Sequence, residues 1–359
     1  MDQKRLETLL VAMSRVGASA LHLVPGRAPA MRVQRRFVTG DEVPVQAADV
    51  EELTRDMSFA DHRARLASNG HVDILYVARS GSRYRVTIAE AGGRHSLVFR
   101  PVPESPPQLD AIDLPEQVGS FARSRAGLVV VAGFFGSGKS TTLAALVEAL
   151  NQDASRHIVT IEDSIQFIHQ QGPALMHQRE VGTHVASTAD GIRQAMVGGV
   201  DAIMVSDVRD GETLEAAIAA AESGCLVLAG VEAGSIVGAM TELTSLVPFE
   251  QRPRLRTRLS RALRGAMAQS LLNRLHRVGR IPVVEILVGN PAARAAIRKG
   301  NLQDLPGIMQ RCRGLGMQTT DIALRVLLGR HLVTQEEALL HATDRDEVVA
   351  RGPNPVSVR

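Results

Sequence analysis

The sequence Gly133-Phe-Phe-Gly-Ser-Gly-Lys139-Ser140 decides the fold of this chain. It matches the pattern G-x-x-x-x-G-K-[ST] and lies between an apolar run, residues 128–132, and an amphipathic run, residues 141–150. A strand, a glycine-rich turn and a helix in that order form a P-loop, so the sequence predicts one here. The alternative is a glycine turn that binds no nucleotide, and the strand and helix patterns on either side argue against it.

The residue types of this loop suit a phosphate chain. Backbone N–H groups must approach phosphate oxygens closely, and glycines leave the room that side chains would fill. The lysine supplies a cation for the outer phosphates, and the serine that follows puts a hydroxyl where Mg²⁺ would bind. The predicted cofactors are therefore ATP and Mg²⁺. The predicted binding residues are Gly133, Gly136, Ser137, Gly138, Lys139, Ser140 and Thr141.

Composition bounds the class of protein. With 359 residues, of which 45% are apolar and 22% charged, the chain can bury a large core, and its length favours two domains. Its two cysteines, Cys225 and Cys312, are too few for a disulfide framework and suit a reducing compartment. No apolar run reaches the roughly eighteen residues of a membrane span, and residues 1–30 lack a signal pattern. We expect a cytoplasmic protein that reaches a membrane only through a partner.

The domain organisation follows from composition and periodicity. Residues 1–104 mix a helix-like opening with short alternating runs, which predicts a small α+β domain. Prolines crowd residues 105–115 and predict a linker. A phosphate-loop domain is expected over 116–270, a helical region over 271–345 and a flexible tail over 346–359.

Strands and helices alternate in the second domain, which predicts an α/β, doubly wound and mostly parallel sheet with ligands at the carboxyl ends of its strands. Strands are expected at 128–132, 158–161, 202–205 and 226–229, and helices at 140–151, 186–196 and 211–222. After residue 235 the chain is expected to be helical, with apolar periodicity over 255–272 and 321–328.

Acidic residues follow two of these strands. Glu162 and Asp163 come after one, and Asp207 comes after the next. A phosphate-loop enzyme uses such carboxylates to hold Mg²⁺ and to orient the attacking water. One acidic strand end alone is as often a solvated cap, but two in one domain favour the catalytic interpretation.

Several motifs resemble the hexameric ATPases of type II and type IV secretion and of pili. Residues 158–163 are similar to their acidic box, and residues 178–182, 207–210 and 316–321 are similar to the pilus-retraction, twitching-motility branch. The stretches 21–23 and 29–33 resemble the opening of that branch, so the similarity covers roughly residues 5–340.

The resemblance implies a PAS-like N-terminal domain, a RecA-like ATPase domain and a homohexameric ring, or a mixed assembly with a paralogous ATPase. It implies catalytic roles for Glu162 and Asp207, and water-mediated Mg²⁺ binding by Asp163 together with Ser140. Three arginines of the first domain, Arg85, Arg94 and Arg100, would reach the phosphates. The residues alone would place these arginines in solvent. The implied partner is a platform protein of the pilus or secretion machinery in the inner membrane.

The chain also departs from the family pattern. The family has glutamate where this chain has Asp207, and aspartate draws its carboxylate back by roughly 1.5 Å, on a scale where about 1 Å can cost ~10²-fold in rate. The two family histidines correspond to Cys225 and Glu232, and the acidic box continues Ser164-Ile165-Gln166 in place of Pro-Ile-Glu. Phosphate binding should therefore survive better than turnover. Glu232 either faces the phosphates or points away from them.

Three functions remain open on the sequence. One is a hexameric motor for pilus retraction, and another is a hydrolysis-poor subunit that binds ATP and acts with a competent paralogue. The third is a nucleic-acid translocase, for which Arg254, Arg258 and Arg261 on one predicted helix face would be suitable. Because only 3% of residues are aromatic, stacking platforms for bases are scarce and nucleic acid is an unlikely partner.

Overall fold

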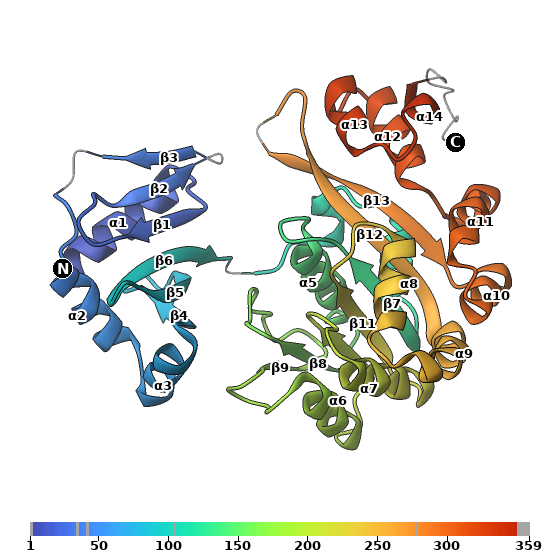
Figure 1. Ribbon diagram of the computed structural model, residues 1–359, viewed down its shortest axis with the longest axis horizontal. Helices are drawn as coiled ribbons and strands as arrows, with labels where there is room; N and C mark the ends of the chain where they lie inside the picture. The colour runs from blue at the N-terminus through green and yellow to red at the C-terminus, as the bar shows by residue number, and fades with distance from the viewer. Residues whose placement is uncertain (1–2, 34–35, 41–42, 104, 278, 350–359) are drawn as a thin grey trace. The chain divides into compact units, whose positions relative to one another are not determined.

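The computed structural model describes residues 3–33, 36–40, 43–103, 105–277 and 279–349. The chain divides into two compact units (Figure 1). The first unit comprises Met1–Ser105 with Gln166–Ile168, and the second comprises Pro106–Ile165 with His169–Arg359.

The first unit is an α+β domain with a six-stranded antiparallel sheet in the order β3-β2-β1-β6-β5-β4. The strands are β1 (Ala20–Leu23), β2 (Ala30–Val33), β3 (Arg36–Thr39), β4 (His71–Val77), β5 (Arg83–Ala91) and β6 (Arg94–Val102). The helices are α1 (Gln3–Arg15), α2 (Ala47–Met57) and α3 (Ala60–Asn69). The apolar spacing that predicted the first helix is confirmed, because Leu6, Leu10 and Met13 of α1 are buried in the core with Phe99 of β6.

The second unit contains a seven-stranded sheet in the order β13-β12-β7-β11-β10-β8-β9. Its strands are β7 (Gly127–Ala132), β8 (His157–Glu162), β9 (Leu175–Glu180), β10 (Ala202–Val205), β11 (Leu226–Val231), β12 (Leu263–Asn273) and β13 (Arg280–Val288). All neighbours pair in parallel except β12 with β13. The predicted parallel sheet is thus confirmed, and an antiparallel strand is added at one edge.

Helices cover both faces of this sheet (Figure 1). They are α4 (Glu116–Ala122), α5 (Lys139–Leu150), α6 (Thr188–Val197), α7 (Gly211–Glu222), α8 (Ile236–Ser245) and α9 (Arg252–Ala262). The buried strand β7 alternates between the two cores: Val129 and Val131 pack with α4 and α5, whereas Leu128 and Val130 pack with α6 to α9. Packed helices thus cover both faces of the sheet. In sheets of this type, ligands bind at the carboxyl ends of the strands.

The C-terminal part adds α10 (Pro291–Lys299), α11 (Leu305–Arg311), α12 (Thr320–Gly329), α13 (Gln335–His341) and α14 (Arg345–Val349). Short 3₁₀ turns are η1 (Leu109–Ile112), η2 (Phe249–Gln251), η3 (Leu302–Asp304) and η4 (Arg313–Leu315). The expectation of a flexible tail from residue 346 is wrong for its first residues, because Val348 of α14 is buried. Residues 350–359 lie outside the described part of the chain. Within that part, no helix is long and apolar enough to cross a bilayer.

The predicted helix over 255–272 is wrong in its second half. The helix α9 ends at Ala262, and β12 begins at once and runs to Asn273. The apolar residues Leu255, Leu259, Leu263 and Met267 recur every four positions, and that spacing returns to the same face of a helix and also of a strand. All four are buried, but Leu263 packs into the core on the α6–α9 side of the sheet and Met267 into the core on the α4–α5 side, because the register shifts between Leu263 and Gly265. The spacing thus identified buried residues but neither a single face nor the type of element. The boundary proposed at residue 270 falls inside β12.

Candidate nucleotide-binding site

The loop between β7 and α5 has the predicted strand–turn–helix form. Gly136 and Gly138 have φ angles of +81° and +89°, which L-residues with a side chain rarely adopt. A β-carbon at Gly138 would lie 2.6 Å from Nε2 of Gln269, and one at Gly133 would lie 2.1 Å from Oγ of Ser137. Glycine is required at these positions by the backbone and by its neighbours. The hydroxyl of Ser137 is buried and has no hydrogen-bond partner among the described residues.

Two residues of this site, Gln269 and Arg280, were not predicted from the sequence. The buried side chain of Gln269, on β12, donates from Nε2 to the Ser137 carbonyl at 2.8 Å. Its Oε1 accepts from the Thr142 hydroxyl at 2.7 Å. Arg280, the first residue of β13, also contacts the loop: its Nη1 donates to the Gly136 carbonyl at 3.0 Å. Both residues were hidden because their segment was expected to be helical.

The structure brings the lysine of the loop to the predicted carboxylates. The Lys139 ammonium forms an ion pair with Oδ1 of Asp207, and these side chains are only 12% and 17% exposed. Arg209 bridges the two acidic strand ends: its Nη1 lies 2.7 Å from Asp163 and its Nη2 lies 3.2 Å from Asp207. One guanidinium therefore holds both carboxylates beside the loop lysine, at the carboxyl ends of β8 and β10.

Glu162 occupies a different environment. Its carboxylate is buried, and Oε1 accepts from the Thr160 hydroxyl at 2.7 Å and from Nε2 of Gln178 at 3.3 Å. Thr160 and Glu162 alternate with Val159 and Ile161, which face the α6–α7 layer, so they lie on the α5 side of the sheet. Glu162 is thus directed to the face that carries the helix after the P-loop.

A buried histidine supports the same region. His169 Nδ1 lies 2.9 Å from a carboxylate oxygen of Glu148 on α5, and its backbone N–H donates to Gln178 at 2.9 Å. Burial lowers the pKa of His169, and the hydrogen bond and charge of Glu148 oppose that shift. The polar groups around Glu162 are therefore anchored to the P-loop helix.

The two positions that correspond to family histidines do not lie together. Cys225 precedes β11 and Glu232 follows it, so the strand's six residues put them roughly 20 Å apart. The Cys225 thiol is buried and donates to the Val200 carbonyl at 3.1 Å, and burial raises its pKa. Cys225 therefore lies at the end of β11 away from the loop, where it cannot contact a phosphate bound there.

Glu232 lies at the same edge of the sheet as the loop. The backbone N–H of Gly133 donates to the Val231 carbonyl at 3.1 Å, so Glu232 directly follows a residue bonded to the start of the loop. The Glu232 side chain is exposed. Of the two positions, only Glu232 remains a candidate for contact with a bound ligand.

The three predicted arginines lie on the β5–β6 pair of the first unit. Arg85 and Arg100 are cross-strand partners, whereas Arg94 starts β6, six residues from Arg100. Arg85 forms an ion pair with Asp73, and Arg100 donates to the Thr87 hydroxyl at 3.1 Å. Burial acts to raise the pKa of Asp73, but hydrogen bonds from Thr87 and Arg85 hold it below its ordinary value. The structure thus groups Arg85 with Arg100 and separates Arg94. Their contact with phosphates stays a prediction.

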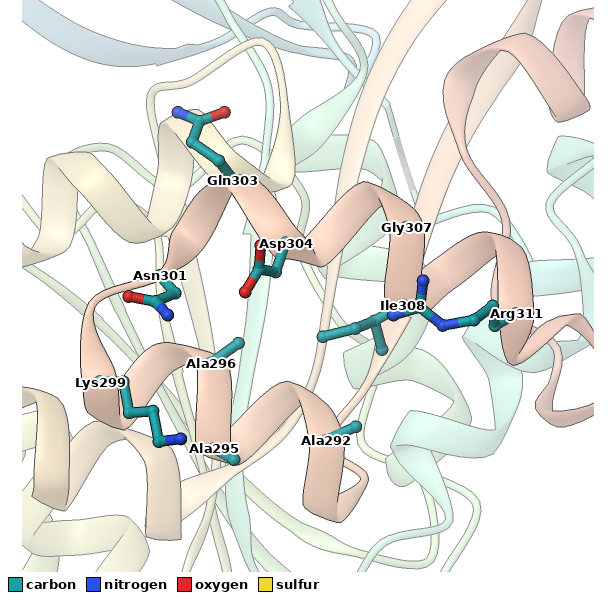
Figure 2. Close-up of a pocket in the computed structure, with 10 residues that line it drawn as sticks. All are labelled: Ala292, Ala295, Ala296, Lys299, Asn301, Gln303, Asp304, Gly307, Ile308 and Arg311. Atoms are coloured by element: carbon teal, nitrogen blue, oxygen red, sulfur yellow. The ribbon is translucent and has the colours of Figure 1, made fainter.

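Cavities are present in the described part of the second unit. One of about 290 Å³ adjoins the P-loop, and its lining includes Gly138, Thr141, Gln269, Arg274 and Arg280. A larger one of about 560 Å³ lies between α10, η3 and α11 (Figure 2). Asp304 and Ile308 project toward α10 there, and Lys299 lies at the end of that helix. None of the residues lining the larger cavity is a predicted site residue.

One arginine on the basic face of α9 forms ion pairs with other residues of the chain. Arg258 forms ion pairs with Glu215 and Glu222 of α7, the latter at 2.8 Å. Arg254 and Arg261 are exposed. The pairing of Arg258 removes the central cation from the surface that a nucleic acid would require.

Comparison with known proteins places this site in a family. Residues 95–281 match the family model described as Type II/IV secretion system protein. The type IV pilus ATPase PilU of Pseudomonas aeruginosa is 32% identical over 342 residues, covering 95% of this chain and 90% of that protein. The type IV pilus retraction ATPase PilT of the same organism is 32% identical over 330 residues, covering 92% and 96%.

A solved structure agrees with these relatives. The crystal structure of the pilus retraction motor PilT with bound ADP has a TM-score of 0.86 and 31% identity, covering 96% of this chain and 99% of that one. That likeness extends over both units, and the P-loop lies within the matched family region. The chain therefore belongs to the type II/IV secretion ATPase family, among the type IV pilus ATPases of twitching motility.

Proposed function

We propose that this protein binds ATP with Mg²⁺ at residues 133–141 and couples ATP hydrolysis to pilus retraction or twitching motility. The observation that carries the proposal is the Lys139–Asp207 ion pair at the mouth of a glycine loop with left-handed backbone. The relatives support it, because PilU and PilT are named as type IV pilus ATPases and the PilT crystal structure contains ADP.

Phosphate binding would use the loop and its lysine. The left-handed glycines shape a concave backbone whose N–H groups can face an anion, and α5 starts at Lys139. Lys139 would exchange the Asp207 carboxylate for a phosphate oxygen. The fit is favourable because the loop has no room for side chains at Gly133 and Gly138.

The carboxylates would divide the remaining work. Ser140 and Asp163 would hold Mg²⁺, which neutralises charge on the outer phosphates when bound. Glu162 would orient the attacking water from the α5 side of β8, and Asp207 would act from the end of β10. Arg209 already fixes the separation between Asp163 and Asp207 by binding both.

The assembly would be a ring. We propose a homohexamer, or a mixed assembly with a paralogous ATPase, in which arginines of the first unit complete the phosphate site. Arg85 and Arg100 are the better candidates because they are adjacent, and Arg94 is the weaker one. The ring would be cytoplasmic and attached to the inner membrane through a pilus or secretion platform protein.

A second function is favoured by Asp207 itself. Its carboxylate is shorter than glutamate and is already shared between Lys139 and Arg209. A water-orienting group that is short and held by two cations would support slow hydrolysis. The chain would then be a hydrolysis-poor subunit that binds ATP and regulates a competent paralogue.

The test is ATP affinity of Lys139→Ala beside that of Lys299→Ala. Lys139 would lose a charge-assisted bond to phosphate, which predicts a weakening of roughly 10- to 100-fold. Lys299 is exposed at the end of α10, so its removal should leave the affinity at the wild-type value. Equal ATP affinity of the wild type and Lys139→Ala would contradict the proposed function.

A further inference from the structure

We propose that Gln269 is a positioning residue that holds the P-loop in the form that receives phosphate. The inference rests on the proposed function, because it assigns a cause to the shape of that same site. Gln269 lies on β12, outside the loop and outside α5. It acts through hydrogen bonds of a neutral amide.

The amide of Gln269 can be oriented in only one way. The Ser137 carbonyl can only accept, so the group facing it at 2.8 Å must be the NH₂ end of the amide. The oxygen end then faces the Thr142 hydroxyl at 2.7 Å, where it accepts. Gln269 is 6% exposed and Thr142 is fully buried, so both bonds are largely shielded from bulk water.

The bond to Ser137 sets the direction of a neighbouring N–H. The peptide group is planar and trans, so the carbonyl of Ser137 and the N–H of Gly138 point to opposite sides of one plane. With its carbonyl drawn toward β12, Ser137 directs the Gly138 N–H away from β12. Gly138, at a φ of +89°, is a residue whose peptide could otherwise rotate at low cost.

The backbone around Gln269 leaves little freedom. In the β12–β7 register, Ala268 is opposite Ala132, so Gln269 lies beside the first residue of the loop. A β-carbon at Gly133 would lie 3.0 Å from the Gln269 carbonyl oxygen, and one at Gly138 would lie 2.6 Å from its Nε2. The strand backbone and the Gln269 side chain therefore approach the two loop glycines too closely to admit a β-carbon at either position. One amide ties the end of the loop to the first turn of α5.

Gln269→Glu tests the donor end of this amide. The substitution keeps the shape but sets a carboxylate oxygen against the Ser137 carbonyl, so ATP affinity at about pH 8 should fall roughly 10- to 100-fold. As the pH drops to about 6, the buried carboxyl takes up a proton and can donate again. The affinity relative to wild type at each pH should then recover.

Gln318→Glu is the matched control. Gln318 also donates its Nε2 to a backbone carbonyl, that of Val284 at 2.7 Å, and it lies in the same unit. The same chemical change there should leave the ATP affinity ratio near one at every pH. Unfolding midpoints of both variants without nucleotide show how far each one is folded.

Thr142→Val and Thr142→Ser test the acceptor end and keep the inference testable if Gln269→Glu does not fold. Valine removes the hydroxyl that fixes the amide, so ATP affinity should fall about 3- to 10-fold. Serine keeps the hydroxyl and should restore most of that loss.

The outcomes separate this inference from the proposed function. Weak ATP binding by the wild type, or equal binding by Lys139→Ala, would overturn the proposed function. If Lys139→Ala loses affinity while Gln269→Glu binds ATP like the wild type at every pH, the inference alone is overturned. A loss in Gln269→Glu that does not recover at lower pH, or equal losses in Thr142→Val and Thr142→Ser, would also overturn it.

Discussion

The ammonium group of Lys139 and the carboxylate of Asp207 form a largely buried ion pair between the start of α5 and the end of β10. The second carboxylate oxygen of Asp207 lies 3.2 Å from Arg209. Because a bound phosphate would take over Lys139, Asp207 would keep Arg209 as its cation. Asp207 therefore affects ATP binding through Lys139 and would affect hydrolysis through its own carboxylate. Substitutions at this residue can separate the two effects.

Glu232 and Cys225 are predicted to respond differently to histidine. Glu232→His replaces an exposed carboxylate next to the loop with a neutral or cationic ring, so turnover should rise because repulsion of phosphate is removed. Glu232→Gln removes the same negative charge, so it should give most of that gain if charge alone is responsible. Steady-state ATP turnover measures both, and an unchanged rate in both variants would mean that Glu232 does not reach the site.

Cys225→His is predicted to lower stability and leave turnover per folded molecule unchanged. The thiol is buried and bonded to the Val200 carbonyl, so a larger ring overpacks the layer at a cost of about 1–3 kcal/mol. Thermal unfolding and an active-site-normalised rate measure the two effects. A change in rate as large as that of Glu232→His would contradict the placement of Cys225 at the far end of β11.

The first unit should lose stability in Asp73→Asn in a pH-dependent way. Because the folded pKa of Asp73 lies below its ordinary value of 3.8, its carboxylate contributes stability above that pH. The contribution is lost as the pH falls through the lower folded pKa. Asp73→Asn should therefore be less stable than the wild type by about 1 kcal/mol near neutral pH. The gap should close below pH 3.8.

Tyrosine fluorescence during urea unfolding of the full chain measures this. The chain has two tyrosines and no tryptophan, and Tyr76 and Tyr84 both lie in the first unit. Asp56→Asn, at an exposed position of α2, is the matched control and should follow the wild type. A gap that is constant with pH would show that Asp73 acts through packing and not through its charge.

The second unit alone should not form a stable ring. The segment 106–359 keeps Leu109 and Leu114 packed against the α5 layer, so it is expected to fold, but it lacks Arg85 and Arg100. Light scattering with ATP present should show a hexamer for the full chain and a smaller species for the segment. A hexamer of equal stability from the segment would exclude the first-unit arginines as required parts of the assembly.

The sequence predicted the centre of the fold because local pattern and tertiary role agree there. Residues 128–132 are apolar on both faces, and the strand that they form is buried on both faces. The helices predicted at 211–222 and 321–328 appear as α7 and α12, since the spacing of their apolar residues fits the period of a helix and not that of a strand. The rule that parallel strands end at one edge places Asp207 near the loop, as expected, but its ion pair with Lys139 was not predicted.

The rest required the three-dimensional structure. An apolar residue every fourth position fits both helix and strand, so β12 was assigned as helix and Gln269 was overlooked. The two positions related to histidines are close in sequence motif but separated by the full length of β11. The length of β11 decides which end of the sheet each residue occupies, and a short sequence motif does not contain that length.

ATP affinity and turnover of the wild type and Asp207→Glu, measured side by side, test the central claim most directly. We predict tight binding and slow turnover in the wild type, and a rate raised by about tenfold or more in Asp207→Glu with little change in affinity, because the longer side chain restores the carboxylate position. Asp201→Glu is the control, because Asp201 lies at the opposite end of β10, where it accepts from the His157 N–H at 2.8 Å. Turnover that is fast in the wild type and collapses in Asp207→Glu would contradict the account, and tight binding with no turnover in either protein would leave only the regulatory subunit.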